Sequence, residues 1–141
     1  MISEQKPNRI DPETLERLLL TAPFHRWLGL RLSAMDEGGI EVFLPWREEL
    51  ISNAAIRSTH GGILASLIDL TGLFAVLAKT AALISTVDLR VDYHRTATPG
   101  NLLARAEILR LGSRVSSAQT FVRAEDGTVV ASGRGVYLTT D

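Results

Sequence analysis

The stretch that decides the fold of this chain is STHGGILASLIDLTGLFAVLA, residues 58–78. From Gly61 to Ala78 it is apolar nearly all round, which predicts one long helix enclosed by other elements. Asp69 is the only formally charged residue of the stretch. A carboxylate in such surroundings is costly to bury unless it is paired or hydrogen-bonded, and no Lys or Arg stands one helical turn away. Asp69 therefore needs a partner from another element or a chemical role.

Length and composition predict a single domain over residues 1–141. Hydrophobic residues make up 45% and charged residues 22%, which are ordinary proportions for a folded domain and exclude disorder. The formal net charge of −1 argues against nucleic acid or an anionic membrane as a partner. The chain has no cysteine, which excludes disulfides, thiolate nucleophiles and cysteine metal sites. A reducing cytoplasm is the location we expect.

Two segments bear on export and membrane insertion. Residues 1–9 are polar and lack the apolar run of a secretory signal. Residues 61–78 are barely long enough to span a bilayer, and a central Asp would cost roughly 3 kcal/mol on insertion scales. We therefore expect a buried helix of a soluble protein and no membrane partner.

Local signals place the remaining elements. Asp11 and Pro12 are typical of a helix start, and Asp126-Gly127 is a strong hairpin turn. The last four expected strands follow one another and predict an antiparallel meander. In chain order we expect a flexible segment at 1–10, a short helix at 11–22, strands at 30–36 and 40–45, a polar loop at 48–59, the long helix, and strands at 86–94, 102–111, 115–124 and 128–138.

The first strand after the long helix alternates between polar and apolar residues. Val87, Leu89, Val91 and Tyr93 then share one face, and Thr86 lies on the other. The predicted fold class is α+β: one long central helix wrapped by a curved antiparallel sheet of about six strands, with a short N-terminal helix. Such a sheet leaves an edge and apolar surface exposed, which a homodimer would cover.

Several motifs occur together in this order of elements. They are His60-Gly61-Gly62, then Leu67 and Asp69 on the following helix, the strand Val87-Asp88-Leu89-Arg90-Val91-Asp92-Tyr93 with its ending Thr98-Pro99-Gly100, and the closing Asp126-Gly127 turn. In this combination the chain resembles the hotdog-fold thioesterases of the phenylacetate-pathway type. The resemblance covers residues 24–138, nearly the whole chain.

The resemblance implies hydrolysis of acyl-CoA thioesters at sites shared by two subunits of a homodimer. Whether two such dimers join in a tetramer is open on the sequence alone. It implies that the Gly61 N–H polarises the thioester carbonyl, that Asp69 of the opposite subunit is general base or nucleophile, and that Thr86 helps to hold water. Family members usually carry Asn or Gln six residues before the His. That position is Ala54 here, and Asn53 stands one place earlier. CoA is part of the substrate, so no separate cofactor is implied.

Elementary chemistry supports the same roles. The first N–H groups of a helix lack internal partners and carry the positive end of its dipole, so Gly61 is suited to stabilise an oxyanion. At 1.5 Å per residue, Asp69 lies about 13 Å from His60 along the helix, too far for one carbonyl to touch both. If both groups are catalytic, they serve one site only when they come from different helices.

The sequence offers further candidate site residues besides Gly61 and Asp69. His60 orients the loop, and with His25 and His94 as the only other histidines we predict no metal site. Gly62, Ser66 and Thr86 are candidates for substrate binding, although Ser66 lacks the neighbours of a nucleophile. Guanidinium matches phosphate oxygens, so an arginine is suited to bind the phosphates of CoA, but each one taken alone is also explained as a solvated surface charge, and the sequence does not choose among them: Arg90, Arg95, Arg110, Arg114 and Arg123.

Three alternatives stay open on the sequence alone. Asp69 is a structural acid bonded by Ser66, Thr71 or a partner chain, or the chain is a non-catalytic acyl-CoA-binding module. The third alternative is a hotdog hydratase or dehydratase that uses His60 and Asp69 as an acid–base pair. The acyl group, and the choice between general-base and covalent routes, are likewise open.

Overall fold

The computed structural model describes residues 6–82 and 85–139. Its helices are α1 (Pro12–Leu19), α2 (Pro23–Leu28) and α3 (Gly61–Thr80), with a short 3-10 turn η2 (Glu48–Leu50). Its strands are β1 (Arg31–Met35), β2 (Gly39–Leu44), β3 (Ile51–Asn53), β4 (Ser58–Thr59), β5 (Ser85–Tyr93), β6 (Leu102–Arg110), β7 (Val115–Arg123) and β8 (Val129–Leu138).

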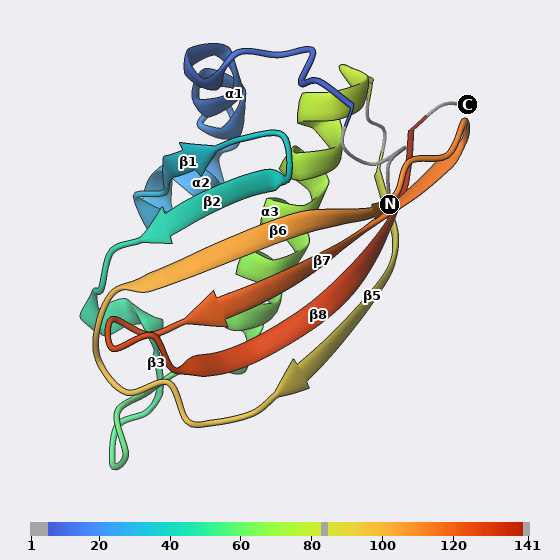
Figure 1. The fold of residues 1–141 in the computed structure, drawn as a ribbon. Helices are drawn as coiled ribbons and strands as arrows, with labels where there is room; N and C mark the ends of the chain where they lie inside the picture. The colour runs from blue at the N-terminus through green and yellow to red at the C-terminus, as the bar shows by residue number, and fades with distance from the viewer. Residues whose placement is uncertain (1–5, 83–84, 140–141) are drawn as a thin grey trace.

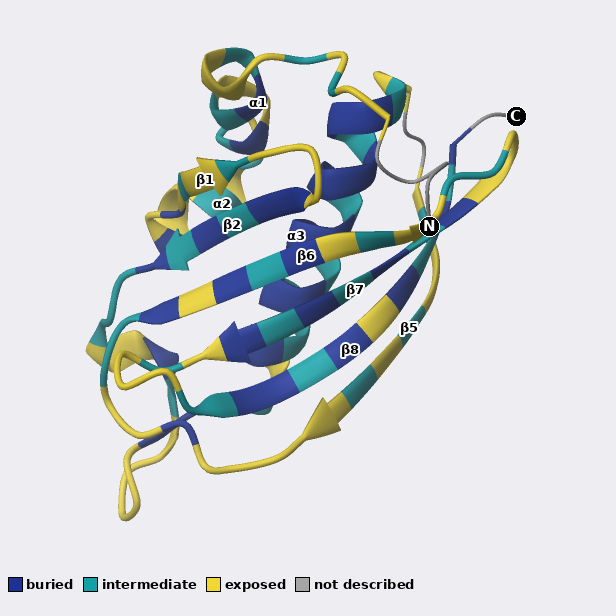
Figure 2. Cartoon of the chain, viewed as in Figure 1, coloured by how far each residue is buried: buried dark blue, intermediate teal, exposed yellow. Residues whose placement is uncertain are grey.

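A curved antiparallel sheet wraps one side of α3 (Figure 1). Its six strands have the order β1-β2-β6-β7-β8-β5, and β3 pairs with β4 in a separate ribbon. The buried residues gather on α3 and on the strands in front of it (Figure 2). This architecture is the hotdog fold, and it confirms the predicted fold class, including the long central helix and the six strands.

The N-terminal part forms two short helices instead of one. Asp11 caps α1 and Pro12 occupies its first position, as predicted. The helix ends at Leu19, three residues earlier than expected, and a second helix begins at Pro23. We did not predict α2 from the sequence, although its signals are present: a proline at the start and Gly29 in the left-handed conformation (φ 71°) at the end.

The segment predicted as a polar loop, residues 48–59, is more ordered than expected. It contains η2 and the β3–β4 ribbon, which pairs antiparallel. At its end the His60 N–H donates to the Leu50 carbonyl at 2.7 Å, and the Thr59 N–H donates to the Ala97 carbonyl at 2.8 Å. These bonds fix the point at which α3 begins.

The strand that follows α3 corrects the predicted meander. Strands β6, β7 and β8 do form a meander, but β5 pairs with β8, and β6 pairs with β2. The chain therefore leaves α3 for the far edge of the sheet, opposite the β1–β2 hairpin (Figure 1). The periodicity of one strand reports which side chains share a face, but it does not report which strand lies next to it.

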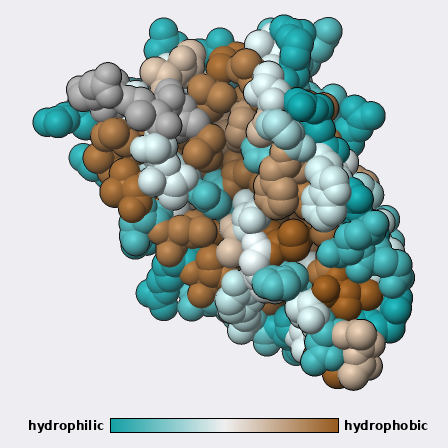
Figure 3. All heavy atoms as spheres, turned by 180° about the vertical axis from the view of Figure 1, so that it is seen from behind, coloured by the Kyte–Doolittle hydropathy of each residue, from teal (hydrophilic) through white to brown (hydrophobic). Residues whose placement is uncertain are grey.

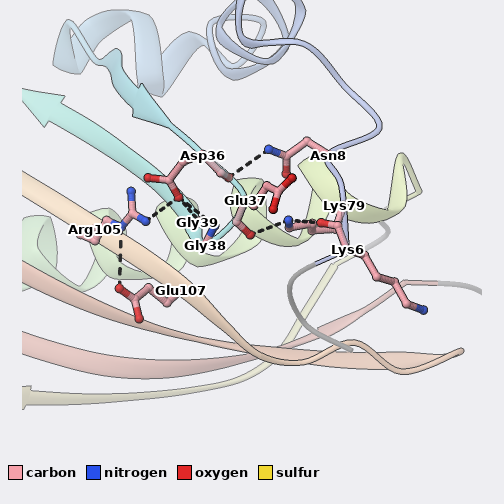
Figure 4. A network of polar contacts seen from close by, with 9 residues as sticks. All are labelled: Lys6, Asn8, Asp36, Glu37, Gly38, Gly39, Lys79, Arg105 and Glu107. Carbon is pink, nitrogen blue, oxygen red and sulfur yellow. Dashed lines mark hydrogen bonds and ion pairs between the residues drawn. The ribbon is translucent and has the colours of Figure 1, made fainter. Parts of the chain in front are cut away.

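A polar network closes the C-terminal end of α3 (Figure 4). Lys79 is buried, and its ammonium donates to the carbonyls of Lys6 and Glu37. Burial lowers the pKa of Lys79. The network ties the first described residues to the turn between β1 and β2. Residues 1–5 of the segment predicted to be flexible lie outside the described residues.

One stripe of α3 has no complete cover within the described chain. Ser66, Asp69, Leu73 and Leu77 follow one another at helical spacing and are only partly buried. Figure 3 shows apolar side chains gathered on the face of the molecule where α3 is not covered by the sheet. By length and hydropathy α3 would suit a membrane span, but 56% of its most apolar window is buried, as in the core helix of a globular domain.

Candidate active site

The side chain of Asp69 is directed at the beginning of β5. Thr86 Oγ1 donates a hydrogen bond of 2.7 Å to Asp69 Oδ1. Asp69 is partly buried, and its second carboxylate oxygen has no partner among residues 6–82 and 85–139. The carboxylate is therefore held at one oxygen and open at the other.

A β-bulge in β5 brings Thr86 to this position. Thr86 pairs with Tyr137 of β8, but the register shifts before Asp88, so Val87 is an extra residue in the strand. Simple alternation placed Thr86 on the face opposite Leu89, and that prediction was wrong. The bulge turns the threonine toward α3 and leaves the Val87 side chain 61% exposed.

The hydroxyls on α3 do not bind the Asp69 carboxylate. Ser66 Oγ donates to the Gly62 carbonyl at 2.8 Å, and Thr71 Oγ1 donates to the Leu67 carbonyl at 2.6 Å. Both are bonds to the helix's own backbone, one turn earlier. The side-chain partner of Asp69 thus comes from the sheet.

A histidine caps the start of α3. Nδ1 of His60 accepts the Gly62 N–H at 2.8 Å, which requires a neutral imidazole with an unprotonated Nδ1. The Gly61 N–H donates to no group in the described part of the chain. The positive end of the helix dipole therefore offers Gly61 as an available donor, whereas the N–H of Gly62, a predicted substrate-binding residue, is already used.

Tyr93 is a residue of this site that we did not predict from the sequence. Its Oη donates to the Gly61 carbonyl at 2.8 Å, and a Cβ added to Gly61 would lie 3.3 Å from its ring. An open hollow of about 400 Å³ lies beside this contact, lined by the β3–β4 ribbon, the first turns of α3 and residues 93–97. The only signal in the sequence was the place of Tyr93 at the end of a motif strand.

The two reactive groups of α3 are far apart within one chain. Gly61 and Asp69 are separated by eight residues, about 12 Å along a helix. Asp69 does not line the hollow beside Gly61. One thioester carbonyl cannot contact both groups of the same helix.

Asn53 and the five arginines predicted to bind phosphate bond neither the Gly61 N–H nor the Asp69 carboxylate. Asn53 ends β3, and its Oδ1 accepts the N–H groups of Ala55 and Ile56 at 2.9 and 3.4 Å, which closes an exposed turn. Among the five arginines, Arg95 lines the hollow beside Gly61. The other four lie elsewhere on the sheet or in its turns: Arg90, Arg110, Arg114 and Arg123.

A larger hollow, of about 640 Å³, lies at the other end of α3. Among the described residues, three cations line it, Lys6, Arg9 and Lys79, but no carboxylate does, and the Lys79 ammonium is already bonded to two carbonyls. The described lining therefore supplies no base for water. Across the described ranges, no three His, Cys, Asp or Glu side chains gather in a way that would hold a metal ion.

Comparisons with known sequences point to one family. The sequence profile of the Thioesterase superfamily matches residues 58–131, a range that includes His60, Gly61, Asp69 and Thr86. The medium/long-chain acyl-CoA thioesterase YigI of Salmonella typhimurium is 28% identical over 138 aligned residues. The match covers 87% of this chain and 89% of that protein.

Solved structures agree with this result. An X-ray structure of a protein from the thioesterase superfamily has a TM-score of 0.89 at 47% identity, covering 92% of this chain and 98% of the other. A crystal structure of a Shewanella oneidensis protein related to the same superfamily has a TM-score of 0.83 at 30% identity, with 94% and 99% covered.

Proposed function

The chain belongs to the thioesterase superfamily, and from this premise we propose that it hydrolyses acyl-CoA thioesters to the free acid and CoA. The observation that carries the proposal is the pair of groups on α3: the available Gly61 N–H beside a hollow, and the Asp69 carboxylate with one held and one open oxygen. The name of the relative YigI, an acyl-CoA thioesterase, supports CoA as the thiol.

In the proposed mechanism, the thioester carbonyl oxygen accepts a hydrogen bond from the Gly61 N–H. The open oxygen of Asp69 takes a proton from water, and the resulting hydroxide attacks the carbonyl carbon. Negative charge then develops on the carbonyl oxygen, where the N–H and the helix dipole stabilise it. The C–S bond breaks, and the CoA thiolate leaves and is protonated. Direct attack by Asp69, followed by hydrolysis of the anhydride, is the alternative route.

We propose that each site forms between two protomers of a homodimer, with Gly61 from one and Asp69 from the other. The distance of about 12 Å between these residues along one helix supports this arrangement. So does the partly buried stripe that carries Asp69, because a second protomer would cover it. Among the described strands, β5 pairs with β8 on one side only, so its other side is a sheet edge that a second protomer could pair with. A dimer of dimers is the larger assembly we propose.

For the substrate, we propose that Arg95 binds a phosphate of CoA at the hollow beside Gly61, since it lines that hollow and a guanidinium matches phosphate oxygens. The acyl chain would lie along the apolar part of the α3 stripe, next to Leu73 and Leu77. Medium and long acyl chains are therefore the first to test, followed by the aryl thioesters of the phenylacetate-pathway type. The cytoplasm is the proposed location.

The decisive experiment measures release of free CoA from short, medium, long and aryl acyl-CoA. Asp69→Asn should lower kcat by about 10²- to 10⁴-fold, because it removes the base. The matched control is Asp92→Asn, which changes an exposed carboxylate on β5 that pairs with Arg90 at 3.5 Å; it should stay near wild type. Full activity in Asp69→Asn would overturn the mechanism. Acyl-CoA binding without turnover would indicate a binding module, and a change in enoyl absorbance would indicate a hydratase.

A further inference from the structure

Tyr137 on β8 reaches α3 at the residue that carries the proposed chemistry. Its side chain is fully buried, and its Oη donates to the main-chain carbonyl of Asp69 at 3.1 Å. A buried phenol requires a hydrogen-bond partner, and in a helix most carbonyls are already bonded to an N–H one turn later. Burial, together with the nearby Asp69 charge, raises the pKa of Tyr137, so the hydroxyl stays protonated and remains a donor.

Two glycines make room for this phenol. A Cβ at Gly72 on α3, or at Gly135 on β8, would collide with the Tyr137 hydroxyl. A glycine inside a helix costs about 1 kcal/mol relative to alanine. The chain nevertheless places one three residues after Asp69, at the point where the phenol enters. Both the helix, through Gly72, and the strand, through Gly135, therefore have the space that the contact between Tyr137 and Asp69 requires.

The partner strand supplies the second contact to the same residue. Thr86 and Tyr137 lie directly opposite each other in the β5–β8 pairing. Thr86 holds the Asp69 side chain through Oδ1, while Tyr137 holds its main chain through the carbonyl oxygen. Because the sheet fixes the separation of a cross-strand pair, the two hydroxyls fix both ends of Asp69.

We propose that Tyr137 is a positioning residue for the carboxylate of Asp69. It contacts no substrate. By anchoring the main chain of Asp69 to the sheet, it keeps the carboxylate within reach of Thr86 and keeps the open oxygen in a constant direction. The role rests on the proposed function of Asp69 as base or nucleophile.

The fold contains a matched control for this bond. Thr120 on β7 is also buried, and its Oγ1 donates to the main-chain carbonyl of Ile68 at 3.4 Å, one residue before Asp69. Thr120→Val therefore removes a contact of the same kind, from sheet hydroxyl to helix carbonyl, without touching Asp69. A loss of general helix–sheet packing would affect both variants alike.

In steady-state kinetics, Tyr137→Phe should lower kcat about tenfold with KM unchanged, since small displacements of a reacting group are costly. Thr120→Val should stay within about twofold of wild type, because its bond is to Ile68 and its loss does not displace the reacting group. In an Asp69→Asn background, Tyr137→Phe should have no further effect on the residual rate. An equal loss in the two single variants, or a tenfold loss that persists without the Asp69 carboxylate, would overturn the proposal.

A second measurement does not depend on turnover. The carboxylate 13Cγ resonance of Asp69, assigned by its absence in Asp69→Asn, should move at pH 8 in Tyr137→Phe and stay in place in Thr120→Val. Gly72→Ala offers a second route to the same change, because the new Cβ displaces the phenol oxygen while alanine favours the helix. An unmoved Asp69 resonance in Tyr137→Phe and in Gly72→Ala would overturn the positioning role. Absence of CoA release from the wild type would instead overturn the proposed function.

Discussion

Thr86 on the edge strand β5 donates a 2.7 Å hydrogen bond to Asp69 on α3, even though strict alternation would point its side chain away from the helix. The bulge at Val87 is the cause, because it adds one residue to β5 and reverses the side of everything before it. A local irregularity in one strand thus supplies the partner that the lone acid of the long helix requires.

The first prediction concerns this hydrogen bond. Thr86→Val keeps the shape of the side chain but removes the donor, and a hydrogen bond to a charged group contributes about 1.5–3 kcal/mol. We expect kcat for CoA release to fall by about 10- to 150-fold, with Thr86→Ser close to wild type because it retains the hydroxyl. Equal activity in the valine and serine variants would show that the bond plays no part in turnover.

The second prediction isolates the Gly61 N–H. His60 has φ −57° and ψ 131°, a conformation compatible with a following proline, and proline is well tolerated at the first position of a helix. Gly61→Pro therefore deletes the N–H with little change in the backbone. Relative to Gly61→Ala, we expect a further loss in kcat/KM of about 10²- to 10³-fold, the usual effect of one oxyanion donor.

Gly61→Ala is the control for this comparison because it keeps the N–H and adds only a methyl group near the Tyr93 ring. Circular dichroism and thermal unfolding should show that both variants fold. Similar kinetics for the proline and alanine variants would mean that the N–H does not stabilise the oxyanion.

The third prediction tests whether the site is shared between protomers. A heterodimer purified through two different tags, with Asp69→Asn in one protomer and Gly61→Pro in the other, carries both lesions in one of its two symmetric sites and neither in the other. We expect about half of the wild-type activity from it, although each homodimeric variant is nearly inactive. Sites contained within single protomers would leave the heterodimer as inactive as its parents.

The fourth prediction concerns stability at acid pH. The Arg105 guanidinium, which donates to Asp36 Oδ1 at 2.8 Å, holds the pKa of that carboxyl below its usual value of 3.8. A depressed folded pKa contributes stability that is present above pH 3.8 and is lost as the pH falls through the folded value. Because Asp36 is largely exposed, the contribution should be at most about 1 kcal/mol.

Urea unfolding of wild type and Asp36→Asn checks this expectation at fixed protein concentration. The variant should be less stable at pH 7, and the difference should shrink as the pH falls toward 3. A difference that is constant over this range would assign the effect of the substitution to something other than the charge of Asp36.

Much of the fold could be read from the order of local signals. The all-round apolar pattern of residues 61–78 predicted α3, whose observed end at Thr80 is two residues later. The period of two predicted β5, and the turn residues predicted the hairpins, because these signals depend on neighbours along the chain. The pairing of β5 with β8 could not be read in the same way, because it depends on how the sheet covers the helix.

The candidate site, like the fold, was predicted where it depends on neighbours along the chain and missed where it depends on tertiary packing. The sequence by itself determined that a lone carboxylate and a glycine pair lie on one long helix, too far apart to meet within one chain. Only the tertiary structure decided which groups bind Asp69 and Gly61. Thr86, just before a bulge, bonds the Asp69 carboxylate, and Tyr137 bonds the Asp69 main-chain carbonyl through the gap left by two glycines. Tyr93 bonds the Gly61 carbonyl at the first turn of the helix. A helix presents its residues at a fixed spacing, whereas its hydrogen-bond partners come from strands whose register is set by packing of the whole sheet.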